Sequence, residues 1–100
     1  MNDKIKLLEQ ELNAVYAERN QCVAALAFMA IRVGFNAGIK KDLEAEDGWQ
    51  TVVFIDLPQG QVSWHYHDSE EKLLYGLPEY KAEYDGHTTE EKYRRLNLLC

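Results

Sequence analysis

Apolar side chains recur at every third or fourth residue through the first third of the chain, the spacing that places them on one face of a helix. The pattern predicts a helix from about residue 3 to 34, within a helical part that covers 1–38, with a coiled-coil seam along it. Over four heptads, eight of the nine seam positions are apolar: Ile5, Leu8, Leu12, Val15, Arg19, Cys22, Leu26, Met29 and Val33.

The two halves of this helix differ in the residues that flank the seam. Glu9, Glu11 and Glu18 flank the seam in the first half, which is typical of a solvent-facing contact between two helices. Residues 22–31 are apolar all round, so we expect that stretch to be surrounded on several sides. Arg19 is the one polar seam residue, and such a residue sets register and partner number.

A helix this long leaves too little of a 100-residue chain to cover it. We therefore predict that the chain pairs with itself, as a homodimer or small oligomer. The alternative is a monomer whose helix folds back over the rest of the chain. The interface residues predicted for the paired helix are Leu8, Leu12, Val15 and Arg19.

Residues 49–67 predict a two-stranded antiparallel hairpin, because both runs are rich in β-branched and aromatic residues and the second alternates cleanly. The turn has Pro58 and Gly60, which favours a three-residue loop with Leu57 opposite Gln61 and Phe54 opposite Trp64. That register predicts an apolar face that packs on the helix: Val52, Phe54, Val62, Trp64 and Tyr66. Residues 35–48 are expected to be a connector, with a short helical turn at 39–45.

The sequence of the last third, 68–100, predicts an irregular segment with short helices. A short helix is expected from residue 68 or 69 to 74, followed by an irregular stretch over 77–87. Thr88 and Glu91 form a capping box that opens a final helix over 90–99. The fold class predicted is α+β in a single domain: a long N-terminal helix, a two-stranded hairpin and short C-terminal helices.

Composition and charge argue against several classes of protein. The net charge is −6 and no basic stripe is present, which argues against direct binding of nucleic acid. The longest apolar stretch has ten residues, about half of what a membrane-spanning helix needs, and the N-terminus lacks a signal-peptide core. Two cysteines without metal-ligand spacing form no disulfide framework. We therefore expect a cytoplasmic protein with no membrane contact.

The three histidines lie close together in sequence, between residues 65 and 87. His65 and His67 fall on one face of a strand, and Asp85 and His87 add a second carboxylate–imidazole pair. Such a set suits zinc or another divalent metal, with His65, His67 and His87 as ligands. Structural or surface histidines, and a polar ligand site without metal, are the alternatives.

The start of the final helix is a second candidate site. His87, Thr88 and Thr89 would surround exposed amides that favour an anion such as the phosphate of a nucleotide, with Tyr84 available for stacking. The alternative is a plain helix cap. No glycine-rich phosphate loop and no GxSxG elbow is present, so an enzyme is not favoured and no catalytic residues are assigned.

Six Tyr and two Trp in 100 residues point to contacts with another protein. Tyr80 and Tyr84 lie in the acidic last third and are the aromatic residues that we predict at such an interface. Core filling is the alternative.

The strings QVSWH, LPxY and DGHTTEEKYRRL resemble small uncharacterised proteins of tailed phages and prophages over the last 45 residues or so. This resemblance implies a phage accessory protein in the cytoplasm of a bacterial host. The leading hypothesis is a non-enzymatic inhibitor or adaptor that binds a host or anti-phage defence protein. The alternatives are a nucleotide- or metal-binding protein that uses His65, His67, Asp85 and His87, and a coiled-coil structural component.

Overall fold

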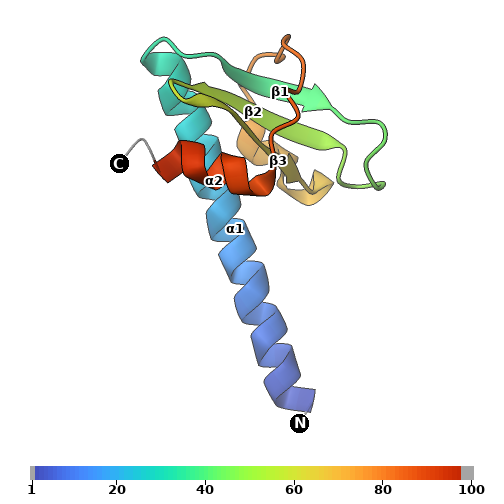
Figure 1. Ribbon diagram of the computed structural model, residues 1–100. Helices are drawn as coiled ribbons and strands as arrows, with labels where there is room; N and C mark the ends of the chain where they lie inside the picture. The colour runs from blue at the N-terminus through green and yellow to red at the C-terminus, as the bar shows by residue number, and fades with distance from the viewer. Residues whose placement is uncertain (1, 98–100) are drawn as a thin grey trace.

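The computed structural model describes residues 2–97, and these form a head with one long helix that projects from it (Figure 1). The helix α1 spans Asn2–Arg32, close to the predicted range. It ends in a Schellman motif, because Gly34 takes a φ of 97° and the Phe35 amide donates to the Ala30 carbonyl at 2.9 Å. Cys100 and the last two residues of the predicted final helix lie outside the described residues.

The sheet has three antiparallel strands in the order β1-β2-β3, so the prediction of two strands was incomplete. The strands are β1 (Ala37–Lys41), β2 (Thr51–Leu57) and β3 (Gly60–Tyr66). The predicted connector over 35–48 contains β1, and the helical turn expected at 39–45 is wrong. Tertiary context decides here: Ile39 also exchanges backbone hydrogen bonds with Pro78 and Tyr80, at 3.0 and 2.9 Å.

The β2–β3 hairpin differs from the predicted register by one residue. Leu57 pairs with Gly60 across a two-residue loop, whereas the prediction had Leu57 opposite Gln61. Phe54 accordingly pairs with Ser63, and the predicted pairing with Trp64 is wrong. Because side chains alternate along a strand, this slip moves every β3 residue to the opposite face relative to β2.

The two faces of the sheet therefore have other members than predicted. The face toward α1 is apolar and fully buried at its centre, where Val53, Ile55, Val62 and Tyr66 are 0% exposed. The outer face, covered in part by residues 78–87, carries Val52, Phe54, Gln61, Ser63 and His65.

Helix α1 packs on the sheet through small side chains, which let it approach closely. Val23, Ala24, Ala27 and Ala30 are at most 6% exposed. The Tyr66 hydroxyl donates to the Asn20 carbonyl on α1, and burial raises the pKa of Tyr66 to about 12. The prediction that 22–31 is surrounded on several sides holds in part: the sheet covers one side, Leu26 and Phe28 are partly buried against the core and α1 also contacts η1, whereas Cys22, Met29 and Ile31 are exposed.

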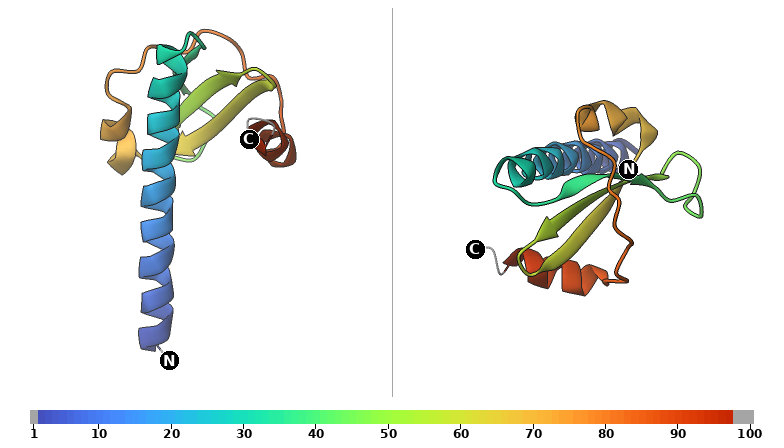
Figure 2. Two further views of the ribbon diagram at one scale, coloured as in Figure 1. Left: turned by 90° about the vertical axis from the view of Figure 1, so that its left-hand side faces the viewer. Right: turned by 90° about the horizontal axis from the view of Figure 1, so that it is seen from above.

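The last third contains two short helices, as predicted. A 3₁₀ helix, η1 (Asp68–Leu74), follows β3, and His67 caps it by accepting a hydrogen bond from the Ser69 amide. Helix α2 (Thr89–Asn97) lies beside β3, with α1 on the other side of the sheet (Figure 2). The Glu91 amide donates to Thr88 Oγ1 at 3.1 Å, which confirms Thr88 as its cap.

Three long cationic side chains line the free edge of β3. Arg95, Lys92 and Arg19 donate to the carbonyls of residues 61, 63 and 65 at 2.6, 3.1 and 3.5 Å. Lys92 Nζ also lies 5.0 Å from the centroid of the Trp64 ring, and burial lowers its pKa. An exposed strand edge invites pairing with other chains, and charged side chains along it oppose that pairing.

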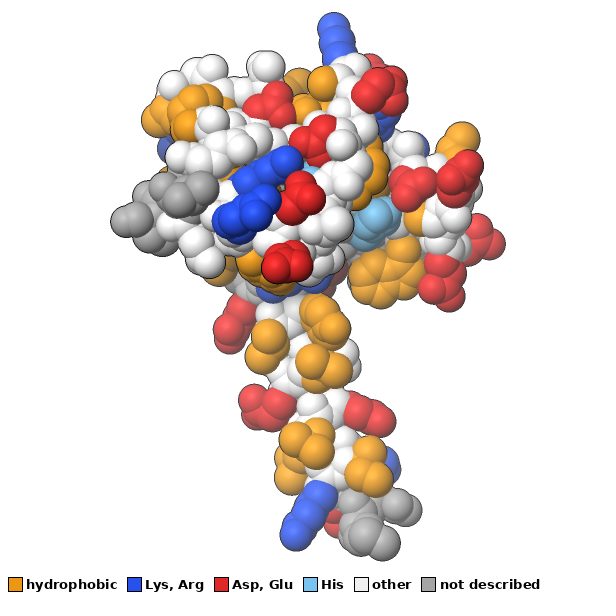
Figure 3. Space-filling view, viewed as in Figure 1, with side chains coloured by type: hydrophobic (Ala, Val, Ile, Leu, Met, Phe, Trp, Pro, Cys, Tyr) orange, Lys and Arg blue, Asp and Glu red, His pale blue; other side chains and the backbone are white. Residues whose placement is uncertain are grey.

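The N-terminal half of α1 extends away from the head and exposes its apolar side chains (Figure 3). Ile5, Leu8, Leu12 and Val15 are between 53% and 70% exposed. We call these four residues the stalk stripe. The described part of the same chain provides no cover for them, whereas the second half of α1 packs on the β2–β3 hairpin.

Gly38 permits the close approach of residues 78–80 to β1. A Cβ at Gly38 would lie 2.5 Å from the Pro78 carbonyl oxygen and 2.8 Å from the Tyr80 nitrogen, both closer than real contacts allow. We expect Gly38→Ala to lower the free energy of unfolding by about 1–3 kcal/mol in urea titrations. Glu79→Ala, an exposed change in the same segment, should stay within about 0.5 kcal/mol of wild type. Equal effects of the two variants would contradict this close packing.

Candidate functional site

His87 is the centre of a hydrogen-bonded cluster on the outer face of the sheet. Its side chain is 4% exposed, and Nδ1 lies 2.7 Å from Asp85 Oδ1. Nε2 lies 3.0 Å from Ser63 Oγ on β3. Because a carboxylate only accepts, Nδ1 donates to Asp85, and in the neutral imidazole Nε2 then accepts from the Ser63 hydroxyl.

The chain around His87 is shaped by local hydrogen bonds. Asp85 Oδ1 also accepts from the His87 amide at 2.9 Å, and Gly86 takes a φ of 83°. The Tyr84 hydroxyl donates to the His87 carbonyl, and its ring meets the imidazole edge-on with centroids 4.9 Å apart. These contacts fix both the position and the orientation of the imidazole.

Arg95 joins this turn to α2 and β3. Its Nη1 lies 3.0 Å from Asp85 Oδ2 and 2.6 Å from the Gln61 carbonyl. Burial acts to raise the pKa of the Asp85 carboxyl, but hydrogen bonds from His87 and Arg95 outweigh it and hold that pKa below its usual value. Asp85 is therefore ionised at neutral pH and orients two cationic or polar partners at once.

Gln61 extends the cluster to Tyr80. Its Nε2 donates to the Tyr80 hydroxyl at 2.7 Å, and its Oε1 accepts from the Asp85 amide at 3.1 Å. The Tyr80 hydroxyl donates to Asp56 at 2.6 Å, while its ring stacks on Phe54 with centroids 4.6 Å apart. Burial and the hydrogen bond to Asp56 raise the pKa of Tyr80 to about 12, so it stays protonated.

A hollow of about 400 Å³ opens beside Ser63 on the same face. Val52 and Phe54 contribute apolar lining, and His65 faces it in a pair with Asp42, with Nε2 and Oδ2 3.0 Å apart. The hydrogen bond from His65 lowers the pKa of the Asp42 carboxyl. The remaining lining residues are polar or aromatic: Lys40, Lys41, Glu44, Glu83 and Tyr84.

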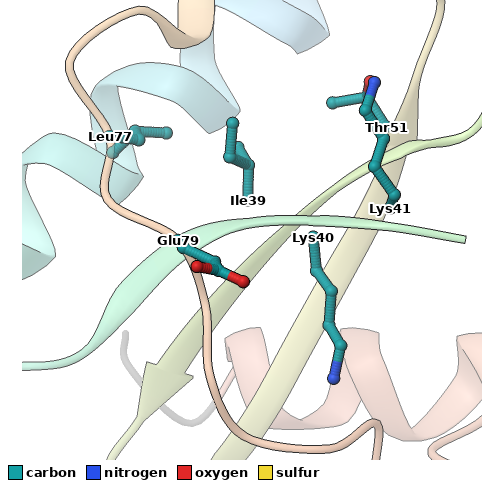
Figure 4. Close-up of a pocket in the computed structure, with 6 residues that line it drawn as sticks. All are labelled: Ile39, Lys40, Lys41, Thr51, Leu77 and Glu79. Atoms are coloured by element: carbon teal, nitrogen blue, oxygen red, sulfur yellow. The ribbon is translucent and has the colours of Figure 1, made fainter.

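A second hollow, of about 490 Å³, lies at the edge of β1 (Figure 4). Ile39 and Lys40 point to opposite sides of the strand, so this hollow straddles the edge rather than enclosing a ligand. Lys41 Nζ lies 2.8 Å from Glu71 and 2.7 Å from Thr51. Hydrogen bonds to Glu71 from Lys41 and from the Thr51 hydroxyl lower the pKa of the Glu71 carboxyl, and the contacts of Lys41 hold its side chain beside the hollow. We regard the hollow beside Ser63 as the better candidate for a ligand-binding site.

The structure does not bring the three histidines together as a metal site. His65 pairs with Asp42, and His67 lies beyond the end of β3, with Nδ1 2.9 Å from Ser69 Oγ and its ring 5.0 Å from that of Trp49. Residues 2–97 contain no group of three or more His, Cys, Asp or Glu that could hold a metal ion.

The other predicted site residues lie in different parts of the structure and do not form one site. Thr88 caps α2 and Thr89 is the first residue of that helix, so neither contacts the hollow. Tyr80, predicted at an interface, is 4% exposed and belongs to the interior, whereas Tyr84 is 54% exposed. The sequence analysis did not identify Ser63, Gln61 and Arg95 as part of the cluster. Strand alternation placed Ser63 beside His65, but no signal showed that residues 85–87 return over β3.

A family model described as the WDGH domain matches residues 3–99. The chain belongs to the WDGH domain family. No curated protein and no solved structure matches this WDGH domain.

Asp85→Asn tests the electrostatic part of the cluster in this WDGH domain. The lowered pKa of Asp85 means that its ionised form stabilises the fold above the unfolded pKa, and this contribution is lost as the pH falls through the folded pKa. We expect Asp85→Asn to lower the free energy of unfolding by about 1–2 kcal/mol at pH 7, since a partly exposed charged hydrogen bond is lost. The difference from wild type, measured by urea unfolding, should shrink as the pH falls below the ordinary carboxyl pKa of about 3.9.

Asp47→Asn is the matched control, because Asp47 is an exposed turn residue. It should leave both the free energy of unfolding and its pH profile close to wild type. An Asp85→Asn profile that runs parallel to wild type from pH 7 to pH 2 would contradict the role of the carboxylate.

Proposed function

We propose that this WDGH domain works by protein–protein interaction, and that the stalk stripe on α1 is the contact surface. The observation that supports this is the exposure of four large apolar side chains, Ile5, Leu8, Leu12 and Val15, at 53% to 70%. Burying a side chain of this kind in a contact contributes about 1.5–3 kcal/mol. Most helical stability in proteins comes from packing of an apolar face, and this face is exposed in the stalk, so a partner would also stabilise the helix itself.

The interaction partner proposed is first a second copy of this chain. A homodimer would present two heads, each with the hollow beside Ser63 and the exposed Tyr84 on its outer face. The resemblance of the DGHTTEEKYRRL string to phage proteins supports an accessory role, in which the heads bind a host or defence protein as an inhibitor or adaptor in the bacterial cytoplasm. No helix within residues 2–97 is long and apolar enough to span a membrane.

Light scattering after size exclusion tests the contact surface. We expect wild type to have twice the 11.6 kDa mass of one chain at micromolar concentration. Leu8→Glu/Leu12→Glu should have the mass of one chain. Burial of two unpaired carboxylates in the contact costs more free energy than burial of the remaining apolar side chains contributes. Gln10→Glu/Ala14→Glu adds the same charges on the other side of the helix and should behave as wild type. A wild type that stays monomeric would contradict the proposal.

A second candidate function is ester hydrolysis at Ser63, supported by the hydrogen-bonded series Ser63–His87–Asp85. The distances of 3.0 and 2.7 Å are those of a nucleophile, a general base and an orienting carboxylate. In this reaction Ser63 Oγ would bond to the acyl carbon and its proton would pass to His87 Nε2. The departing alcohol would take that proton, and water would release the acid by the same route.

A fluorophosphonate probe followed by peptide mass spectrometry tests this chemistry. The probe should label Ser63 in the wild type. Labelling should fall at least tenfold in His87→Gln and vanish in Ser63→Ala. Ser69→Ala, at an exposed serine on η1, should be labelled as wild type. An unlabelled Ser63 in folded wild type would reject this second function.

A further inference from the structure

We infer that two copies of this chain pair through α1 in parallel and in register, with both heads at the same end. The inference rests on the proposed pairing of the stalk stripe and adds its orientation. It depends on the direction that the seam faces, on the charges beside it and on the side chains of Arg19 and Cys22.

The head leaves most of the seam side of α1 open, although Leu26 is partly buried against the core. Met29 and Val33, seam residues beside the head, are 53% and 70% exposed, and Cys22 is also exposed. The head packs on the face formed by Val23, Ala24, Ala27 and Ala30, about a quarter of a turn away from the seam. Figure 2 shows the sheet and α2 on one side of α1 and η1 on another. A second helix can therefore run along the seam without displacing the head.

Charges beside the stalk stripe match in a parallel dimer. Lys4 precedes a seam position and Glu9 follows one, so in a parallel, in-register pair Lys4 of each copy faces Glu9 of the other. By the same spacing Glu11 faces Tyr16, and no acidic residue of the stalk meets another. Two attractive pairs form by symmetry.

An antiparallel pair would bring like charges together. When Ile5 of one helix lies beside Val15 of the other, Glu9 faces Glu9 of the second copy and Glu11 faces Glu11. Two attractive Lys4–Glu18 contacts would form by symmetry, but the two repulsive contacts offset them, whereas the parallel pair has two attractive contacts and no repulsive one. The charge pattern therefore favours the parallel arrangement.

Arg19 would face itself in a parallel pair, yet its side chain is turned toward its own head. Its Nη2 donates to Asn20 Oδ1 at 2.8 Å and lies 3.5 Å from the carbonyl of His65, and the guanidinium is 5.3 Å from the centroid of the Tyr16 ring. These intramolecular contacts hold the charge aside from the seam and reduce the repulsion between the two copies.

Cys22 supplies a built-in reporter of orientation. It is exposed and occupies the seam position that follows Arg19. A parallel, in-register pair sets the two Cys22 side chains opposite each other, within reach of a disulfide. In the antiparallel pair centred on the stalk stripe, each Cys22 lies beyond the end of the partner's seam and the two are far apart.

The first experiment oxidises the full chain with Cys100→Ala and measures the covalent dimer on a non-reducing gel. We expect most chains to form a Cys22–Cys22 disulfide. The control is Gln10→Cys in a Cys22→Ser/Cys100→Ala background, which places the thiol off the seam and should give at least tenfold less dimer.

The second experiment exchanges the stalk charges and measures the dissociation constant of the dimer by sedimentation. Lys4→Glu should weaken the dimer by about 3- to 30-fold, from two symmetric surface pairs. Lys4→Glu/Glu9→Lys should restore wild-type affinity, because the exchange re-creates both pairs in a parallel dimer.

The outcomes separate the orientation from the pairing itself. A dimer by light scattering that neither forms the Cys22 disulfide nor regains affinity in the exchanged variant would overturn the parallel arrangement and leave the proposed interaction in place. A monomer would overturn both. Cross-linking through Cys22 together with rescue by the exchange supports the parallel dimer.

Discussion

The irregular segment 78–87 is held over the outer face of the sheet by hydrogen bonds from side chains, and the cover of that face and the placement of α2 depend on this attachment. Buried polar groups cost free energy unless they are paired, and within residues 2–97 no buried side-chain nitrogen or oxygen lacks a partner. Gln61 binds both Tyr80 and the Asp85 amide, and His87 reaches Ser63. A segment without regular ladders thereby takes a single path across β3.

The same attachment positions α2 and protects the sheet. The Asp85 turn ends where α2 begins, and Arg95 on that helix returns to both Asp85 and the Gln61 carbonyl. Arg95 and Lys92 thus belong to the cluster and to the cationic row along the free edge of β3. The edge is occupied by side chains of its own chain, so association through that strand is opposed while the stalk stripe remains open.

Local signals in the sequence predicted the elements well and their pairing less well. Helix periodicity and the Thr88 cap give α1 and the start of α2, because capping and periodicity act within a few residues. The strand β1 has a weak local preference and exists because β2 and residues 78–80 pair with its two edges. The predicted hairpin register pairs Leu57 with Gln61, whereas in the structure Leu57 pairs with Gly60. This shift of one residue reverses which β3 side chains are buried.

The candidate site was predictable only in part for the same reason. His87 and Asp85 were recognised as a pair, since they are two residues apart. Their contact with Ser63 crosses 24 residues of sequence and depends on the path of the intervening segment, which no periodic pattern encodes. The three histidines are neighbours in sequence, yet strand alternation and the end of β3 send them to different partners.

The two halves of α1 differ in side-chain size, and this difference follows from what each half contacts. Where the helix meets the sheet its buried residues are mostly alanines, Ala24, Ala27 and Ala30, which allow close approach and complete a core within one chain. The stalk instead carries Ile5, Leu8 and Leu12, large side chains that contribute nothing to the folding of an isolated chain while they stay in water. Association of helices varies with concentration, whereas the head does not depend on it. The proposed pairing accounts for the stripe, and folding accounts for the alanine face.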